Sequence, residues 1–342
     1  MTHAKLVPAI DRSKLKIYDP IPEEEHYTPA EKKNAEALSQ LAQSVPSLPL
    51  EPVELAISGW PSSIPVGTGQ PGVDDQGNLY FALRTPTDGA DTVLVFNRQG
   101  QFVRSFGKGP NRIYQHSIKI DLDGNVWVPD AHTSIVTKYS PGGKELMVID
   151  VGEVPDPTIF NAGATDIDFG KSGNIYICDG YINARVLEYT RDGKRIRSWG
   201  SHGSGRGEFD LPHSMAIGPD GTIYVADRSN GRLQWYDENG TQLGERLFGG
   251  LVGSVRVAPK TGEVYVAAGN FFDPKVNFQR YMANLFIFRF DPKTERVLGK
   301  IAYPVHQFAI TADGALFIGL TKREPGDNAA PTFTLFVPKA HA

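Results

Sequence analysis

The fold is decided by the stretch GSHGSGRGEFDLPHSMAIGPDGTIYVADRSNGRLQWYDENG, which occupies residues 200–240. It holds a short apolar segment, a turn that ends in Gly221, and a second apolar segment that ends at Asp227. A third apolar segment, 232–236, and another turn follow. Similar copies recur along the chain, and their turn glycines lie 41 to 52 residues apart. The six turn glycines are Gly77, Gly124, Gly173, Gly221, Gly262 and Gly314.

Hairpins that repeat with this period indicate a β-propeller, because four short antiparallel strands in each repeat of about 40 to 50 residues make one blade. A solenoid is the alternative, but strand–turn–strand repeats of this length favour radial closure. We therefore predict an all-β fold, a six-bladed propeller over residues 51–342. The last copy has too little sequence after it to complete a blade, so we expect an upstream strand near 54–57 to complete it.

Residues 1–50 are predicted to form an extension with one helix. Thr28 suits the N-cap, Pro29 the first helical position and Glu31 the capping box, and we expect the helix to run to about Val45. The sequence as it stands shows no apolar segment of a signal peptide. Its single cysteine, Cys178, fits a reducing compartment, so the expected location is cytoplasmic.

Composition excludes several partners and chemistries. The chain has 35 basic and 39 acidic residues, a net charge of −4, and no basic block, so neither nucleic acid nor an anionic membrane is an expected partner. No apolar run reaches the roughly 18 residues of a membrane span. A GxSxG elbow, a Walker A motif and a Rossmann fingerprint are absent in context, which argues against serine-triad and nucleotide-dependent enzymes.

One position of the repeat predicts a metal site. Eight residues before each turn glycine, histidine alternates with a small residue, although the chain holds only eight histidines. The six residues are Gly69, His116, Thr165, His213, Ser254 and His306. First strands line the channel of a propeller, and alternate blades make a triangle. Three imidazoles there leave a fourth position open, as catalytic zinc sites do. We predict Zn²⁺ or another divalent transition metal; the alternative is polar channel residues bound to water.

Seven residues after the turn glycine, two blades carry arginine, Arg84 and Arg228, and we expect Arg228 to lie opposite His213. Arginine binds carboxylates through two parallel hydrogen bonds, so this pair predicts a substrate with a carboxylate. The alternative is ion pairs with Asp179 or Asp227.

The next position predicts the proton-transfer groups Tyr181 and His132. The pKa of tyrosine is ordinarily near 10, and nearby cations would lower it. The alternatives are a packed loop aromatic for Tyr181 and a solvated turn residue for His132. An aromatic-rich insertion on the same face predicts a lid or acyl pocket, or else a loop packed on the propeller. It contains Phe271, Phe272, Phe278, Tyr281 and Met282.

The quoted stretch resembles an NHL repeat, and this resemblance covers about residues 65–320. Four segments resemble peptidyl-α-hydroxyglycine α-amidating lyase more closely. They are FALRTPTDGADTVLVF at 81–96, YQHSIKIDLDGNVWVPD at 114–130, CDGYINARVLEY at 178–189 and LPHSMAIGPDGTIYVADRSNGRLQ at 211–234.

That resemblance implies a zinc-dependent carbon–nitrogen lyase, which splits an N-acyl-α-hydroxyglycine into an amide and glyoxylate. The substrate would be a small-molecule or peptide-like carbinolamide with a carboxylate. The implied zinc ligands are His116, His213 and His306, and the implied catalytic residues are Tyr181, Arg84 and Arg228. The family also carries a structural calcium, held by main-chain carbonyls and an Asp after the third His. Gln307 occupies that position here, so calcium is not expected.

Two other functions remain open. A metal-dependent propeller hydrolase such as a lactonase usually holds calcium with carboxylate and Asn ligands, unlike this histidine set. A non-catalytic NHL binding module recognises RNA or protein through a charged face, for which this sequence shows no basic excess.

Overall fold

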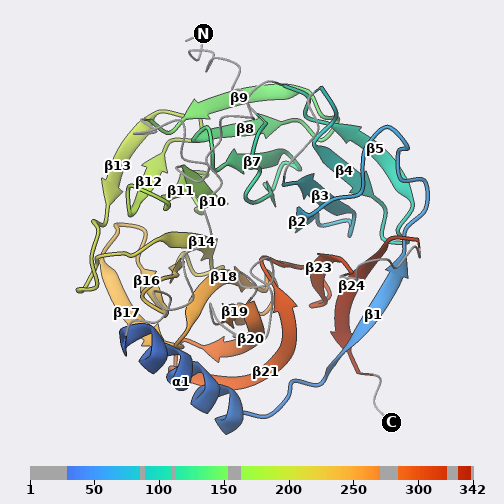
Figure 1. The fold of residues 1–342 in the computed structure, drawn as a ribbon. Coiled ribbons are helices and arrows are strands. Elements are labelled where there is room, and N and C mark those ends of the chain that lie inside the picture. Colours follow the sequence, from blue (N-terminus) through green and yellow to red (C-terminus); the bar gives the residue numbers. More distant parts are fainter. Residues whose placement is uncertain are drawn as a thin grey trace. The chain divides into compact units, whose positions relative to one another are not determined.

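The computed structural model describes residues 29–84, 89–109, 112–152, 163–269, 284–321 and 330–339. Within them, one helix and 24 strands are assigned, and the strands form six four-stranded sheets (Figure 1). These sheets are the blades of a β-propeller, which confirms the predicted all-β, six-bladed fold. The described residues fall into two compact units, 49–167 with 308–339 and 29–48 with 168–307. The predicted division at residue 50 stays a prediction.

The first unit holds two blades whose strands follow chain order, and a third that combines both ends of the propeller region. The first blade consists of β2 (Gly69–Val73), β3 (Leu79–Leu83), β4 (Val93–Phe96) and β5 (Phe102–Phe106). The second consists of β6 (Lys119–Ile120), β7 (Val126–Asp130), β8 (Ile135–Tyr139) and β9 (Glu145–Asp150). The mixed blade consists of β22 (Ala309–Ile310), β23 (Leu316–Leu320), β24 (Thr332–Pro338) and β1 (Leu50–Ala56).

Strand β1 completes the mixed blade, as the sequence predicts. It pairs antiparallel with β24 in an unbroken register from Leu50 with Pro338 to Ala56 with Thr332. Five of its seven side chains are exposed. The ladder of backbone hydrogen bonds therefore contributes more to its attachment than apolar burial does.

The turn between β4 and β5 offers a test of where β1 lies. Gly100 has a φ of 78°, and a Cβ there would collide with the carbonyl oxygen of Ala56 at the end of β1. We expect Gly100→Ala to lower the free energy of unfolding by more than the roughly 1–2 kcal/mol of left-handed strain alone. Gly314→Ala is the matched control, because its φ is 89° and a Cβ there meets nothing within 4 Å. Equal losses in denaturant unfolding would contradict the placement of β1.

The second unit holds α1 (Pro29–Ser44) and three blades whose strands follow chain order. The first blade consists of β10 (Ala164–Phe169), β11 (Ile175–Asp179), β12 (Arg185–Tyr189) and β13 (Arg195–Trp199), although residues 164–167 of β10 are grouped with the first unit. The second consists of β14 (Pro212–Ile217), β15 (Ile223–Asp227), β16 (Arg232–Tyr236) and β17 (Gln242–Leu247). The third consists of β18 (Leu251–Val257), β19 (Val264–Gly269), β20 (Asn284–Asp291) and β21 (Arg296–Val305).

Helix α1 begins at the predicted Pro29 and packs on this unit. Its Leu38 and Ala42 join a buried cluster with Phe248 and Val252 of the blades. The carbonyl of Asn34 accepts a hydrogen bond from the backbone N–H of Gly250 at 2.7 Å. Of the part of the chain that the structure describes, no helix has the length and apolarity to cross a membrane.

The repeat also explains the local geometry of every blade. All six turn glycines have positive φ angles, between 71° and 94°. Each donates its backbone N–H back across its own turn, as Gly221 does to the carbonyl of Gly218 at 2.9 Å. First strands such as β14 are buried, whereas outer strands such as β17 alternate between half-buried and exposed side chains. The inner two strands of this blade, β14 and β15, are therefore more buried than its outer strand β17.

Candidate metal and catalytic site

His213 lies at a β-bulge in β14. Pro212 pairs with Asp227 and Ser214 pairs with Ala226, so His213 has no partner residue on β15. Just before it, Leu211 adopts a φ of 70°, a left-handed conformation that is strained for a leucine. Bulges re-aim side chains at functional sites, and this one directs a histidine that is only 1% exposed.

The backbone of the next blade fixes the tautomer of His213. Its Nδ1 lies 2.6 Å from the carbonyl oxygen of Gly253. Gly253 is itself the extra residue of a bulge in β18, between the pairs Val252–Ala268 and Ser254–Ala267. A carbonyl only accepts, so Nδ1 must carry the proton, and the lone pair of Nε2 is left for another partner.

Two more predicted residues lie beside this ring. The ring centroid of His306 is 5.1 Å from that of His213. The hydroxyl oxygen of Tyr181 lies 3.4 Å from Nε2 of His213, and the two rings meet edge-on with centroids 5.9 Å apart. The second unit thus brings a proposed base and two proposed ligands together. Tyr181 is half-buried and follows β11, so solvent still reaches it.

His116, in the first unit, is also held by a backbone carbonyl at its Nδ1. It is 0% exposed, and its Nδ1 lies 2.7 Å from the carbonyl oxygen of Thr165 on β10. Three residues separate Gln115 from Lys119, whereas two separate their partners on β7, Asp130 and Trp127. Here too the first strand carries one extra residue close to the histidine, between Gln115 and Lys119. The carbonyl again holds the Nδ1 proton, which leaves Nε2 as the candidate metal-binding atom.

Arg84 lies near His116 in the first unit. Its guanidinium carbon is 4.5 Å from the ring centroid of Tyr114, and that ring is 6.1 Å from the ring of His116. A cation over an aromatic face is stabilised by the ring quadrupole. Among the residues that the structure describes, the buried Nε of Arg84 has no hydrogen-bond partner. The Arg84 guanidinium is therefore held by its contact with the Tyr114 ring, and its Nε–H remains available to donate a hydrogen bond.

The prediction that Arg228 lies opposite His213 is wrong, because the strand register does not pair these two residues. The backbone N–H of Arg228 donates to the carbonyl of Leu211, because the bulge at His213 shifts the pairing. In the first blade, where the pairing has no bulge, Arg84 donates to the carbonyl of Thr68, the residue before Gly69. The two arginines thus share a position in the repeat, and Arg228 is only 4% exposed.

The aspartates at the strand ends have structural roles. The Asp227 carboxylate accepts hydrogen bonds from Arg232 Nε at 2.8 Å and Asn230 Nδ2 at 2.8 Å, and Asp179 binds Arg185 in the same way. Burial raises the pKa of Asp227, while these donors act in the opposite direction. Backbone carbonyls thus orient His116 and His213, and the aspartates bind groups of their own turns.

The remaining predicted residues divide into two groups. His132 is 1% exposed, with its backbone N–H bound to Asp130, so its interpretation as a solvated turn residue is wrong. The predicted lid lies outside the described residues and stays a prediction. It comprises Phe271, Phe272, Phe278, Tyr281 and Met282.

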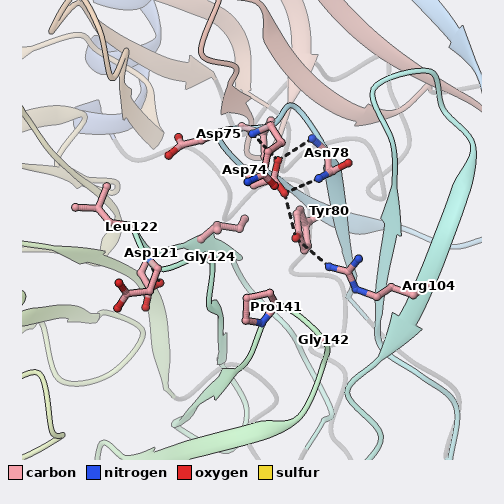
Figure 2. A pocket seen from close by; sticks show the side chains of 14 residues that line it. Asp74, Asp75, Asn78, Tyr80, Arg104, Asp121, Leu122, Gly124, Pro141 and Gly142 are labelled. Carbon is pink, nitrogen blue, oxygen red and sulfur yellow. Dashed lines mark hydrogen bonds between the residues drawn. The ribbon is translucent and has the colours of Figure 1, made fainter.

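A separate cavity of about 580 Å³ lies in the first unit, between turns of the β2–β5 and β6–β9 blades (Figure 2). Its carboxylates serve their own turns: Asp74 accepts from Asn78, and Asp121 accepts from Asn125 and Trp127. Its 14 lining residues include none of the predicted site residues. This cavity is therefore a feature of the turns, and we assign it no chemistry.

The donors fit zinc and do not fit calcium. Two histidines present Nε2 with Nδ1 already satisfied, which suits a borderline-soft metal ion. The position after the third histidine holds Gln307, and its Oε1 accepts a hydrogen bond from Nη2 of Arg256 at 3.0 Å. A guanidinium already uses the oxygen that calcium would require.

Parts of this chain are similar to known proteins. A family model described as NHL repeat matches residues 209–236. The chain is 29% identical over 245 residues to peptidyl-glycine alpha-amidating monooxygenase of Mus musculus, covering 67% of this chain and 24% of that protein. It is 25% identical over 270 residues to peptidyl-alpha-hydroxyglycine alpha-amidating lyase 1 of Drosophila melanogaster, covering 72% and 49%.

The chain thus spans about a quarter to a half of the length of these curated relatives. A gluconolactonase of Xanthomonas campestris has a TM-score of 0.56 and 15% identity, covering 84% of this chain and 89% of that one, and shows the fold alone. The chain is therefore a propeller with one segment that matches an NHL repeat, and its relatives include proteins named peptidyl-α-hydroxyglycine α-amidating lyases.

Proposed function

We propose that this protein is a metal-dependent lyase that breaks the C–N bond of an N-acyl-α-hydroxyglycine to give an amide and glyoxylate. The lyase-named relatives support an enzyme of the amidating type. The observation that carries the proposal is the Tyr181 hydroxyl, which lies 3.4 Å from Nε2 of His213, while the ring centroid of His306 lies 5.1 Å from that of His213. A phenol beside two candidate ligands suits proton transfer next to a metal.

His116, His213 and His306 would hold the metal, each through one ring nitrogen, and Zn²⁺ is the proposed ion. When bound, such an ion lowers the pKa of a hydroxyl group that coordinates it. The carbonyls of Thr165 and Gly253 keep two of the rings in the required tautomer before any metal arrives. Preorganised ligands bind more tightly, because the rings need no reordering.

Tyr181 would accept the proton of the carbinol hydroxyl as the C–N bond breaks. The hydroxyl oxygen becomes the aldehyde oxygen of glyoxylate, and the departing nitrogen takes up one proton to become the amide. Protons and electrons balance without water, which makes the reaction an elimination. His132, one blade earlier at the same repeat position, is the second candidate for a proton-transfer role.

Arg84 and Arg228 would bind the carboxylate of the substrate. We expect Arg84→Lys to reduce kcat/KM by roughly 10- to 150-fold, corresponding to about 1.5–3 kcal/mol for a hydrogen bond to a charged group. Lysine keeps the charge but loses the fork and the planar stacking on Tyr114. Steady-state kinetics with the free acid and its methyl ester measure this.

The loss should be large for the acid and small for the ester. Arg206→Lys is the control, because Arg206 is exposed and donates to the backbone carbonyl of Gln242. An ester that turns over as fast as the acid in the unmodified protein would refute carboxylate recognition.

A substrate panel tests the proposed function against its rivals. The purified protein would be given an N-acyl-α-hydroxyglycine, the corresponding N-acylglycine and a sugar lactone, each with and without added zinc. We expect turnover of the first compound alone. Hydrolysis of the lactone would favour the propeller hydrolase, and inertness toward all three, with zinc bound, would favour a binding module.

A further inference from the structure

A permanently charged side chain is buried beside the second-unit histidines. Arg256 on β18 is only 5% exposed. The acceptors of its guanidinium include Ser214 Oγ at 2.8 Å, the carbonyl of Val255 at 2.8 Å, Gln307 Oε1 at 3.0 Å and the carbonyl of Met215 at 3.4 Å. Burying a charge is costly unless such partners compensate for lost hydration.

The partners of Arg256 follow two of the proposed ligands directly in the sequence. Ser214 is the residue after His213, and Gln307 is the residue after His306. One guanidinium therefore ties together the two backbone segments that carry these rings. The same strand also supplies the Gly253 carbonyl that holds Nδ1 of His213. Strand β18 thus restrains His213 directly, through the Gly253 carbonyl. It also restrains the segments of His213 and His306 through the side chain of Arg256.

The chemistry of these partners is that of a cation site. Carbonyl, hydroxyl and amide oxygens are the ligands that hard divalent cations take in proteins. Here the oxygens accept hydrogen bonds from a guanidinium, whose charge does not depend on pH in the working range. The neutral amide of Gln307 suits a hydrogen-bond donor, where a carboxylate would add charge for a divalent ion.

We propose that Arg256 is a built-in cation that takes the place of a structural metal ion and positions His213 and His306 for the catalytic metal. Only the claim that Arg256 positions the histidines for a catalytic metal rests on the proposed function. Arg256 is a positioning residue, because it acts on the ligands and not on substrate. Its loss should therefore change metal affinity as well as stability.

The first experiment measures the zinc dissociation constant of the whole chain by competition with a chelator. We expect Arg256→Gln to weaken zinc binding by about 10- to 100-fold, the usual cost of losing a group that orients a ligand, and Arg256→Lys to restore part of it. Arg232→Lys is the matched control, since Arg232 is also buried in this unit but pairs with Asp227 and Glu245. It should lower unfolding stability and leave zinc affinity unchanged. Unaltered zinc affinity in folded Arg256→Gln would overturn the proposal.

A second experiment covers the case in which Arg256→Gln fails to fold, or the unmodified chain binds no zinc. The double variant Arg256→Ala with Gln307→Asp replaces the guanidinium with a vacant oxygen set and one carboxylate. We expect millimolar Ca²⁺ to raise its melting temperature and to leave that of the unmodified chain unchanged. The built-in cation would be refuted if Ca²⁺ raised the melting temperature of the unmodified chain, or if it left that of the double variant unchanged. If the unmodified chain bound no zinc, the proposed function would be refuted, but the calcium experiment would still test whether Arg256 replaces a metal ion.

Discussion

Replacing His213 by Ala is expected to remove the bound metal and to reduce kcat/KM more than 100-fold. Loss of a group that only orients a ligand typically costs about 10- to 100-fold in metal affinity or activity, so loss of a ligand should cost more. The side chain is buried, and its Nδ1–H bond to Gly253 would be lost as well. The β14–β15 ladder is formed by backbone groups on either side of the bulge, so we expect the blade to stay folded.

Elemental analysis of dialysed protein and steady-state kinetics measure these two effects together. His202→Ala is the control, because the His202 side chain is 75% exposed, lies near Asp210 and is not one of the predicted ligands. It should keep wild-type metal content and rate. A His213→Ala protein that retains one metal per chain would refute His213 as a ligand.

Tyr181→Phe is expected to reduce kcat by about 10²–10⁴-fold while metal content and unfolding stability stay unchanged. That range is typical for a positioned general base. Phenylalanine keeps the edge-on contact with the His213 ring, and removes only the hydroxyl that lies 3.4 Å from Nε2. The acidic limb of the pH–rate profile should disappear, because the group that must lose its proton is gone.

Tyr236→Phe provides the matched control. Tyr236 is buried in the same unit, and its hydroxyl donates to Gln234 Oε1 at 2.8 Å. We expect it to cost about 1 kcal/mol of unfolding free energy and no catalytic rate. If Tyr181→Phe keeps nearly full activity, the base lies elsewhere, and His132 is the next residue to replace.

The repeat made the architecture predictable. A glycine at one turn position requires a positive φ, and six such positions at a blade-like period fix six hairpins and their phase. The incomplete last copy likewise required a strand from upstream, and β1 supplies it. These features depend on local turn chemistry and on counting, which a single sequence contains.

The bulges were not predictable from alternation. One extra residue at His213 leaves the apolar pattern of β14 intact and shifts Arg228 away from the position that symmetry assigns to it. The carbonyls that hold the imidazoles have no signature, because every residue has one. Pro212 was an available signal, since proline inside a strand is confined to edges and bulges.

Arg256 was missed for a related reason. It stands in the run SVRVAP, where alternation in a strand ordinarily places a charged residue on the solvent side. The structure buries it instead, and the compensating partners come from two other blade segments of the same unit. Only the unusual Gln307 after the third histidine pointed to this place in the sequence. The cytoplasmic location and the lid stay predictions.

The central claim is that the bound metal, held by three histidines, supports cleavage of a carbinolamide. The most direct measurement gives N-benzoyl-α-hydroxyglycine to zinc-loaded and to chelator-treated protein, and quantifies benzamide, glyoxylate and benzoate by chromatography. We expect the loaded protein to release benzamide and glyoxylate in equal amounts at a rate well above spontaneous breakdown, and the treated protein to lose this activity until zinc is restored. Release of benzoate, or full activity without metal, would contradict the account.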